Sequence, residues 1–182
     1  MKHKILCRIL AITLLLLLSL TVVSCSSDEV ETPDGMQLAT AAPEYYFFVP
    51  SSWIVNTGSG TSSAYYSMND MTTVSISVTS YSPIESLDID GYWDMCEEEY
   101  RSEFKNYTFI SEEATTVSSA TKPKNAKSFT YSADFSGKTY KFTQIIFTNG
   151  DMFYTITYTA LTEQYDAHLE ELAKMKSEFV LR

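Results

Sequence analysis

The chain has 182 residues and a formal net charge of −10 at neutral pH, from 13 basic and 23 acidic side chains. Such an acidic composition argues against binding to nucleic acid or to anionic lipid through basic patches. The length suits one domain with a substantial core, and the three cysteines do not make a disulfide framework.

The first 24 residues have the pattern of an export signal. Lys2, Lys4 and Arg8 precede an apolar run over residues 9–23, which ends in small residues. A basic start, an apolar middle and a small-residue end are typical of a secretory signal peptide. A permanent membrane span is the weaker alternative, because such a helix needs roughly 20 apolar residues.

The end of this segment, Val22-Val23-Ser24-Cys25, resembles the lipobox of bacterial lipoproteins. The resemblance implies that residues 1–24 are removed and that Cys25 carries a diacylglycerol and acyl chains such as palmitate. Each buried CH₂ contributes about 0.8 kcal/mol to membrane attachment, so several chains hold a protein firmly. We therefore expect a lipid-anchored protein on a cell membrane, facing outside the cytoplasm, or on the outer membrane of a Gram-negative cell. The alternative is a plain signal peptide followed by an ordinary cysteine.

A polar segment separates this cysteine from the folded part of the chain. Residues 26–43 are rich in Ser, Asp and Glu and contain Pro33 and Pro43, which disfavour regular structure. The sequence thus predicts a lipidated cysteine and flexible linker over residues 25–43, and one domain over residues 44–182.

Most of that domain has the period-two pattern of β-strands. Residues 72–79 alternate cleanly, with Val74, Ile76 and Val78 on one side. Asn149-Gly150 favours a type I′ hairpin turn, and Ser136-Gly137 a second turn. In the strand after Gly150, we expect Met152, Tyr154, Ile156, Tyr158 and Ala160 to form the inner face and Thr155, Thr157 and Thr159 to form the other face. The other predicted strands cover residues 45–49, 64–68, 107–117, 126–135 and 139–148.

Two segments change to a helical period. Residues 89–105 have an apolar stripe that includes Trp93 and Cys96, with Asp88 as a predicted N-cap. Thr162 is the predicted N-cap of a last helix, whose stripe is Tyr165, Leu169, Leu172, Met175 and Phe179. Cys96 is interpreted as a small apolar core residue, because no histidine lies near it in sequence to activate its thiol. The order of elements predicts an α+β fold with an antiparallel sheet and helices packed on it.

Two runs resemble those of PsbP-like domains. The first is Tyr46-Phe47-Phe48-Val49-Pro50-Ser51-Ser52-Trp53, and the second is the strand 153–160 followed by a helix that ends in Ser177-Glu178-Phe179. The resemblance covers about residues 44–182 and implies an α/β/α arrangement with about six to eight antiparallel strands. Relatives include the P subunit of the photosystem II oxygen-evolving complex and a Ran-binding nuclear import factor, which bind partners and are not enzymes. No binding motif carries over to named residues here.

One candidate metal site lies at the entry to the first helix. Ser86, Asp88, Asp90, Gly91, Asp94 and Glu97 match positions 1, 3, 5, 6, 9 and 12 of a calcium loop. Oxygen ligands at these spacings can surround one hard cation. The first position should be Asp, however, and no apolar helix precedes the pattern. We therefore favour helix capping and solvation of the acids, and expect no metal or cofactor.

The other candidates for catalysis are few. His168 is the one histidine beyond the leader, which excludes a multi-histidine zinc site, and no Gly-x-Ser-x-Gly elbow presents a serine. We interpret His168 as a solvated helix residue. The acidic pairs Glu112-Glu113 and Glu170-Glu171 are interpreted as solvated faces, because two-carboxylate hydrolysis needs acids across a cleft.

Four tyrosines remain as a candidate recognition surface, because alternation does not assign Tyr45, Tyr65, Tyr66 and Tyr81 to an inner face. They form a surface for a protein or glycan partner unless helices cover both faces of the sheet. The favoured hypothesis is a non-enzymatic, membrane-anchored binding or accessory module. The alternative is a metal-dependent or hydrolytic enzyme that uses Asp88, Asp90, Asp94 and Glu97, or His168.

The lipid anchor gives the first testable prediction. Protein extracted from native membranes should lack residues 1–24 and carry the mass of a diacylglyceryl group on Cys25. Intact-mass analysis with peptide mapping measures both. An unmodified Cys25, or recovery of the native protein as a freely soluble secreted species, would contradict the prediction.

Overall fold

A computed structural model of the chain describes residues 30–182, except 41, 57–61, 68, 70–73 and 84–85. The chain divides into two compact units, Met1–Glu31 and Thr32–Arg182, and the second contains all the described helices and strands. The predicted signal peptide (1–24), Cys25 and the first part of the predicted linker lie outside the described residues. Neither of the two described α-helices has the length and apolar character that a membrane-spanning helix needs.

In the described part of the chain, one sheet of nine strands forms the centre of the fold. Its strands pair antiparallel, except that β11 runs parallel to β7. From one edge to the other they are β2 (Tyr45–Tyr46), β11 (Val180–Leu181), β7 (Lys105–Ser119), β8 (Lys124–Phe135), β9 (Lys138–Asn149), β10 (Met152–Leu161), β6 (Val74–Tyr81), β5 (Ser62–Tyr65) and β4 (Ile54–Val55). The predicted α+β class is confirmed, with more strands than the expected six to eight because β2, β4 and β11 have two residues each.

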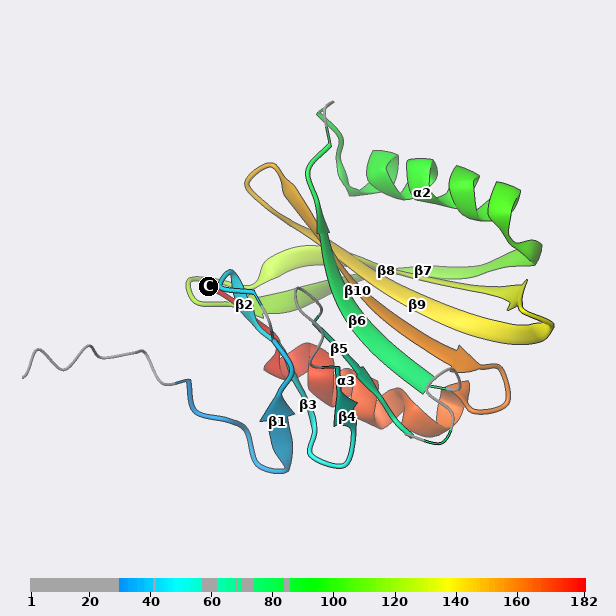
Figure 1. Cartoon of the computed structure of the whole chain (residues 1–182). Helices are drawn as coiled ribbons and strands as arrows, with labels where there is room; N and C mark the ends of the chain where they lie inside the picture. The colour runs from blue at the N-terminus through cyan, green and yellow to red at the C-terminus, as the bar shows by residue number, and fades with distance from the viewer. Residues whose placement is uncertain (1–29, 41, 57–61, 68, 70–73, 84–85) are drawn as a thin grey trace, which may run out of the picture. The chain divides into compact units, whose positions relative to one another are not determined.

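The helices lie on opposite faces of this sheet, as Figure 1 shows. Helix α2 (Ile89–Glu103) covers one face, and α3 (Leu169–Glu178), which follows the short 3₁₀ helix η1 (Tyr165–His168), covers the other. The α/β/α arrangement follows from the central strands, which have too little polar surface to leave either face open to water. A second, two-stranded sheet joins β1 (Met36–Leu38) to β3 (Phe48–Pro50).

Strand β10 shows the consequence of covering both faces. Tyr154, Ile156 and Tyr158 are buried, as predicted for the inner side of the strand. Thr155, on the other face of the strand, is also buried, as is Phe153. The two faces are therefore divided as predicted, and the second face is also buried because α2 covers it. Phe153 belongs to the cluster of apolar side chains that packs under α2.

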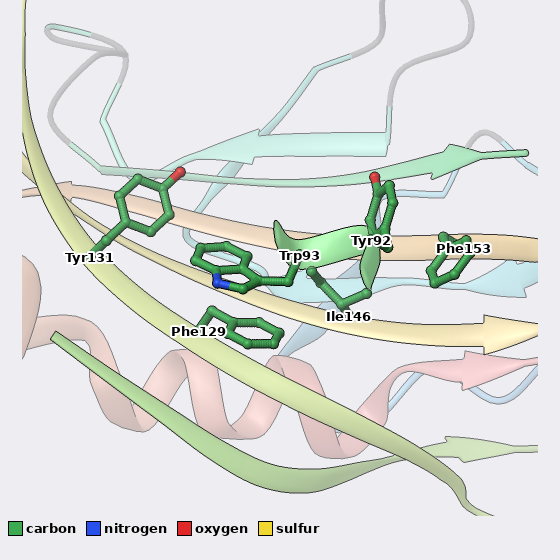
Figure 2. Close-up of a cluster of buried hydrophobic side chains, with 6 residues drawn as sticks. All are labelled: Tyr92, Trp93, Phe129, Tyr131, Ile146 and Phe153. Atoms are coloured by element: carbon green, nitrogen blue, oxygen red, sulfur yellow. The ribbon is translucent and has the colours of Figure 1, made fainter. Parts of the chain in front are cut away.

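Aromatic stacking fixes α2 on the sheet. The Trp93 ring stacks on Phe129 of β8 with centroids 4.2 Å apart and planes 4° from parallel. Tyr92 stacks on Phe153 of β10 with centroids 4.4 Å apart. Figure 2 shows both pairs in the cluster that Tyr131 and Ile146 complete. Such pairs contribute about 0.5–1.5 kcal/mol beyond the area they bury.

The start of α2 is as predicted. Asp88 is the N-cap, and its Oδ1 accepts a hydrogen bond from the Gly91 N–H over 2.8 Å. The side chain thereby pairs one of the backbone donors that the first turn of a helix leaves without a partner. Asp90 follows in the first turn, where the helix dipole favours a negative charge.

The last helix begins later than its sequence pattern predicts. Thr162 is not its N-cap; its N–H and its hydroxyl both donate to the Thr139 carbonyl, each over 3.2 Å. Strand β10 continues to Leu161, which pairs with Tyr140, so the sheet holds the chain extended up to that point. Leu169 is exposed, and Phe179 is the fully buried residue that follows α3.

The folded unit also begins before Glu44. Residues 36–38, which the sequence assigns to the linker, pair with β3, and Met36 and Ala39 are buried. Three residues are too short a run for alternation to distinguish them from a linker.

One of the two hairpin turns differs in detail from the prediction, and the other is as predicted. Gly150-Asp151 joins β9 to β10, because Asn149 still pairs with Met152, and Gly150 has a positive φ of 60°. The hairpin is therefore confirmed, but its turn lies one residue later than predicted. Ser136 and Gly137 join β8 to β9 with φ of 51° and 79°, which suits a type I′ turn.

The stacking of α2 gives a stability prediction. Trp93→Ala should lower the free energy of unfolding by about 3–5 kcal/mol, because it removes a large buried ring and leaves a cavity over Phe129. Urea unfolding measures the change. Met95→Ala on the same helix is the control, since Met95 is 42% exposed and should change stability by about 0.5 kcal/mol or less. Equal losses for the two variants would contradict the role given to Trp93.

Candidate functional site

A large pocket lies where α2 begins. Its volume is about 790 Å³, and it opens between the segment after β6, the first turn of α2 and the β9–β10 turn. We call it the α2-entry pocket. It is lined by Ser82, Pro83, Ser86, Leu87, Asp88, Ile89, Asp90, Lys127, Thr148, Gly150, Asp151 and Phe153.

The charged walls of this pocket already have partners within the protein. Asp88 caps α2. Lys127 Nζ lies 2.5 Å from Asp90 Oδ1 and 2.6 Å from Glu112 Oε1, so this one cation links α2, β8 and β7. Hydrogen bonds with Asp90 and Glu112 raise the pKa of Lys127, which keeps it charged at neutral pH. These side chains determine the shape and the electrostatic field of the pocket, and their contacts within the protein hold them in position.

The calcium-loop pattern is divided between the pocket and the helix. Ser86, Asp88 and Asp90 reach the pocket. Asp94 and Glu97 lie farther along α2, and Glu97 Oε1 accepts hydrogen bonds from Arg101 over 2.8 Å and from the Tyr107 hydroxyl over 2.9 Å. Because α2 begins at Ile89, most positions of the pattern lie along a helix, and their side chains do not surround one cation. Within the described ranges, no three His, Cys, Asp or Glu side chains are grouped so as to hold a metal ion.

A second hollow continues the first toward the β7–β8 turn. It has a volume of about 400 Å³ and shares Ile89, Thr148 and Gly150 with the α2-entry pocket. Lys122 and Lys124 line it. The two hollows together give a groove that is acidic at the α2 end and basic at the β7–β8 end.

His168 is in a different place from the one expected. It is not a solvated helix residue: it is 9% exposed, and its Nδ1 lies 2.5 Å from Glu171 Oε2. The other oxygen of Glu171 accepts a hydrogen bond from Trp53 Nε1–H over 3.1 Å. The rings of Tyr66 and Trp53 lie 4.2 and 6.0 Å from the imidazole. Sequence spacing could not show this, because Trp53 and Glu171 are 118 positions apart.

Glu171 therefore differs from its neighbour. Glu170 is exposed, as expected of a solvated acidic pair, whereas Glu171 joins a buried tryptophan to a buried histidine. His168 lines neither the α2-entry pocket nor the hollow beside it. The arrangement orients an imidazole within a packed aromatic cluster. It is suited to fixing the start of α3 against the segment that contains Trp53.

The four tyrosines and the cysteine are also placed by the fold. Tyr45 is buried and its hydroxyl donates to Ser62 Oγ over 2.8 Å, and Tyr65 is partly buried. Tyr66 and Tyr81 are 44% and 42% exposed, so the predicted tyrosine surface is reduced to these two separate rings. Burial raises the pKa of the Cys96 thiol, which disfavours the reactive thiolate.

Comparison with known proteins identifies the fold. No family model and no curated protein matches the chain. Among solved structures, the chain superposes on cyanobacterial PsbP (CyanoP) from Synechocystis sp. PCC 6803 with a TM-score of 0.56 and 13% identity, over 88% of this chain and 99% of that one. The chain has a PsbP-like fold.

Two further structures have a similar arrangement. LpqN from Mycobacterium tuberculosis, a protein involved in cell envelope biogenesis, matches with a TM-score of 0.53 and 12% identity over 84% of this chain and 82% of that one. PA94 from Pseudomonas aeruginosa, a protein of unknown function, matches with a TM-score of 0.52 and 11% identity over 81% and 97%. At such identities the likeness establishes the fold alone.

The Glu171 cluster gives a prediction about its role. Glu171→Ala should lower the free energy of unfolding by about 1–3 kcal/mol, because it leaves the Trp53 N–H and the His168 imidazole without their partner. Thermal or urea unfolding measures the loss. The adjacent Glu170→Ala is the matched control and should change stability by about 0.5 kcal/mol or less. If Glu171→Ala were as stable as the wild type, the cluster would not be structural.

Proposed function

We propose that the protein is an extracytoplasmic accessory module. A diacylglycerol on Cys25 attaches it to a cell membrane, on the side that faces away from the cytoplasm. The folded unit binds a protein or glycan partner and catalyses no reaction. The partner contacts the α2-entry pocket, which lies between the start of α2 and the β9–β10 turn.

The proposal is supported by the contacts that the charged groups of that pocket make within the protein. Asp88 accepts from the helix backbone, and Asp90 and Lys127 bind each other. Groups held in this way recognise a partner by shape and charge. A reactive acid or base, by contrast, needs a free position toward a substrate.

An exposed aromatic ring beside the pocket supports recognition of a partner. Tyr81 stacks on Tyr92 with centroids 5.6 Å apart, and Tyr92 stacks on Phe153, which lines the pocket. The exposed ring of Tyr81 thus continues a rigid aromatic stack to the surface. Tyrosine in such a position offers an apolar face and a polar hydroxyl, which suits a peptide or a sugar ring.

The enzymatic alternative rests on one observation, the pair of His168 and Glu171. A carboxylate on Nδ1 is the arrangement that orients a histidine base. The ring faces of Trp53 and Tyr66 adjoin the imidazole, and the pair lies apart from the α2-entry pocket. These neighbours favour a packing role over a catalytic one.

Site-specific photocrosslinking in intact cells tests the binding proposal. Benzoylphenylalanine replaces Asp151, an exposed pocket residue, in one variant and Glu163, an exposed residue that does not line the pocket, in the other. We expect a discrete adduct from position 151 that is absent from position 163. Tyr81→Ala should weaken the adduct at position 151 several-fold, because it removes the exposed ring of the stack.

Two outcomes would contradict the proposal. Adducts of equal strength at both positions would place the contact elsewhere or show that it is non-specific. Turnover of any substrate that is lost in His168→Ala, with the fold retained, would replace the binding module with the enzymatic alternative.

A further inference from the structure

Strand β7 has a long edge that the sheet leaves without a neighbouring strand. On one side, β7 pairs with β8 between residues 105 and 117. On its other side, within the described part of the chain, it pairs with β11, at Ser118 and Ser119 alone. The strands at the two ends of the sheet, β2 and β4, are two residues long, whereas this free edge of β7 is several times longer. Such an edge presents a row of backbone donors and acceptors to which another strand can pair.

Residues 111–116 are the most regular part of this edge, and we call them the β7 edge. The register with β8 is continuous from Ser111 onward, whereas it shifts between Lys105 and Thr108 and again between Phe109 and Ser111. In a strand with one neighbour, about half of the backbone amide groups point away from it. A further β-strand is the structure that satisfies such a row of groups together.

Exposed apolar side chains lie at the start of the β7 edge. Phe109 is 39% exposed and Ile110 is 48% exposed. The Phe109 ring lies 6.2 Å from the Trp93 ring, so it rests on the core under α2 while part of it remains in water. A strand added beside these two residues would remove apolar surface from water.

The charge along the β7 edge is negative. Glu112 and Glu113 are both exposed, and because adjacent strand residues point to opposite faces, each face of the edge has one carboxylate. Lys127 binds Glu112 but also binds Asp90, so this group of two carboxylates and one ammonium keeps one negative charge in excess. The described residues give the Glu113 carboxylate no ion-pair partner.

These charges distinguish between two occupants, a second copy of this chain and a segment of another protein. If the β7 edge paired antiparallel with itself, the glutamates of the two copies would lie close together, and like charges there destabilise a sheet. The net charge of −10 also opposes association of two copies. Basic residues in a partner segment would instead meet Glu112 and Glu113. Lys176 of α3 donates to the Thr115 hydroxyl over 3.0 Å, which limits the acidic part of the edge to the two glutamates.

We propose that the β7 edge binds an extended, basic segment of a partner protein as an added β-strand. Two adjacent basic residues of the segment lie beside Glu112 and Glu113, and an apolar residue covers Phe109 and Ile110. Backbone pairing supplies the affinity, and these side chains select the segment. None of the four residues lines the α2-entry pocket, and the inference does not rest on the proposed function.

Hydrogen exchange measured by mass spectrometry tests for the added strand. The protein purified from its own cells is mixed with phosphatidylcholine nanodiscs, which accept a lipid anchor and have no net charge. The probe is the peptide acetyl-Thr-Val-Thr-Lys-Lys-Thr-Val-Thr-amide, whose sequence reads the same in both directions. Without it, about half of the amides of residues 111–116 should exchange quickly. At about ten times its Kd, the peptide should slow their exchange about tenfold and leave β8, which has a strand on each side, unchanged.

Control peptides and variants separate backbone pairing from charge. The same peptide with proline in place of both valines keeps its charge but loses strand conformation, and it should give no protection. The peptide with Glu-Glu in place of Lys-Lys should also give none. Glu113→Gln should weaken binding of the basic peptide about twofold to fivefold, as expected for an exposed ion pair. Glu163→Gln, at an exposed glutamate that follows β10, is the matched control and should leave binding unchanged.

Several results would overturn the proposal. The first is binding of the basic peptide without slower exchange in residues 111–116, or no binding at millimolar concentration. The second is equal protection by the acidic peptide, or equal affinity of Glu113→Gln and the wild type. The third is slow exchange of the β7 edge before any peptide is added. Such protection would make a second copy the occupant if it grew with protein concentration, and a segment of the same chain if it did not.

Discussion

The fold depends on covering both faces of the central strands. Strands β8, β9 and β10 have buried side chains that alternate between α2 and α3, and neither face could remain in water. On one face, Trp93 stacks on Phe129 and fixes α2. On the other, Phe179 follows α3 and packs against Tyr45 and Phe147, with ring centroids 5.3 and 5.4 Å away. Burial on both sides explains why nearly every position of these strands is apolar, aromatic or hydrogen-bonded.

The position of α2 also creates two pockets. The helix crosses the sheet, and a pocket opens at each of its ends: an acidic one where Asp88 caps its start, and an aromatic one around Phe104, where it ends. Between them the core is closed, and the tyrosine hydroxyls in it have partners. Tyr100, for example, bonds to Gln144, while burial raises its pKa to about 12, so it stays neutral under physiological conditions.

Local sequence patterns predicted the elements whose signals lie within a few residues. Asp88 as a helix cap, the period of α2 and the hairpin near Gly150 were correctly predicted, because capping, helical amphipathicity and turn geometry involve neighbours in sequence. The burial of His168 was missed. Its partner Glu171 is local, but Trp53, which makes Glu171 part of a buried network, is 118 residues away from that glutamate.

The sequence by itself determined the α+β class, the acidic surface and the identity of Cys25 as the candidate lipid attachment point, because composition, period and a four-residue motif are properties of the chain. The tertiary structure decided which polar residues meet. Asp90 pairs with Lys127, whereas Glu97 bonds to other residues. His168 is buried beside Trp53. Phe104 and Phe135 meet at the rim of one pocket. These pairings come from the order of strands in the sheet and from the face each helix covers, and residues far apart in sequence fix both of these.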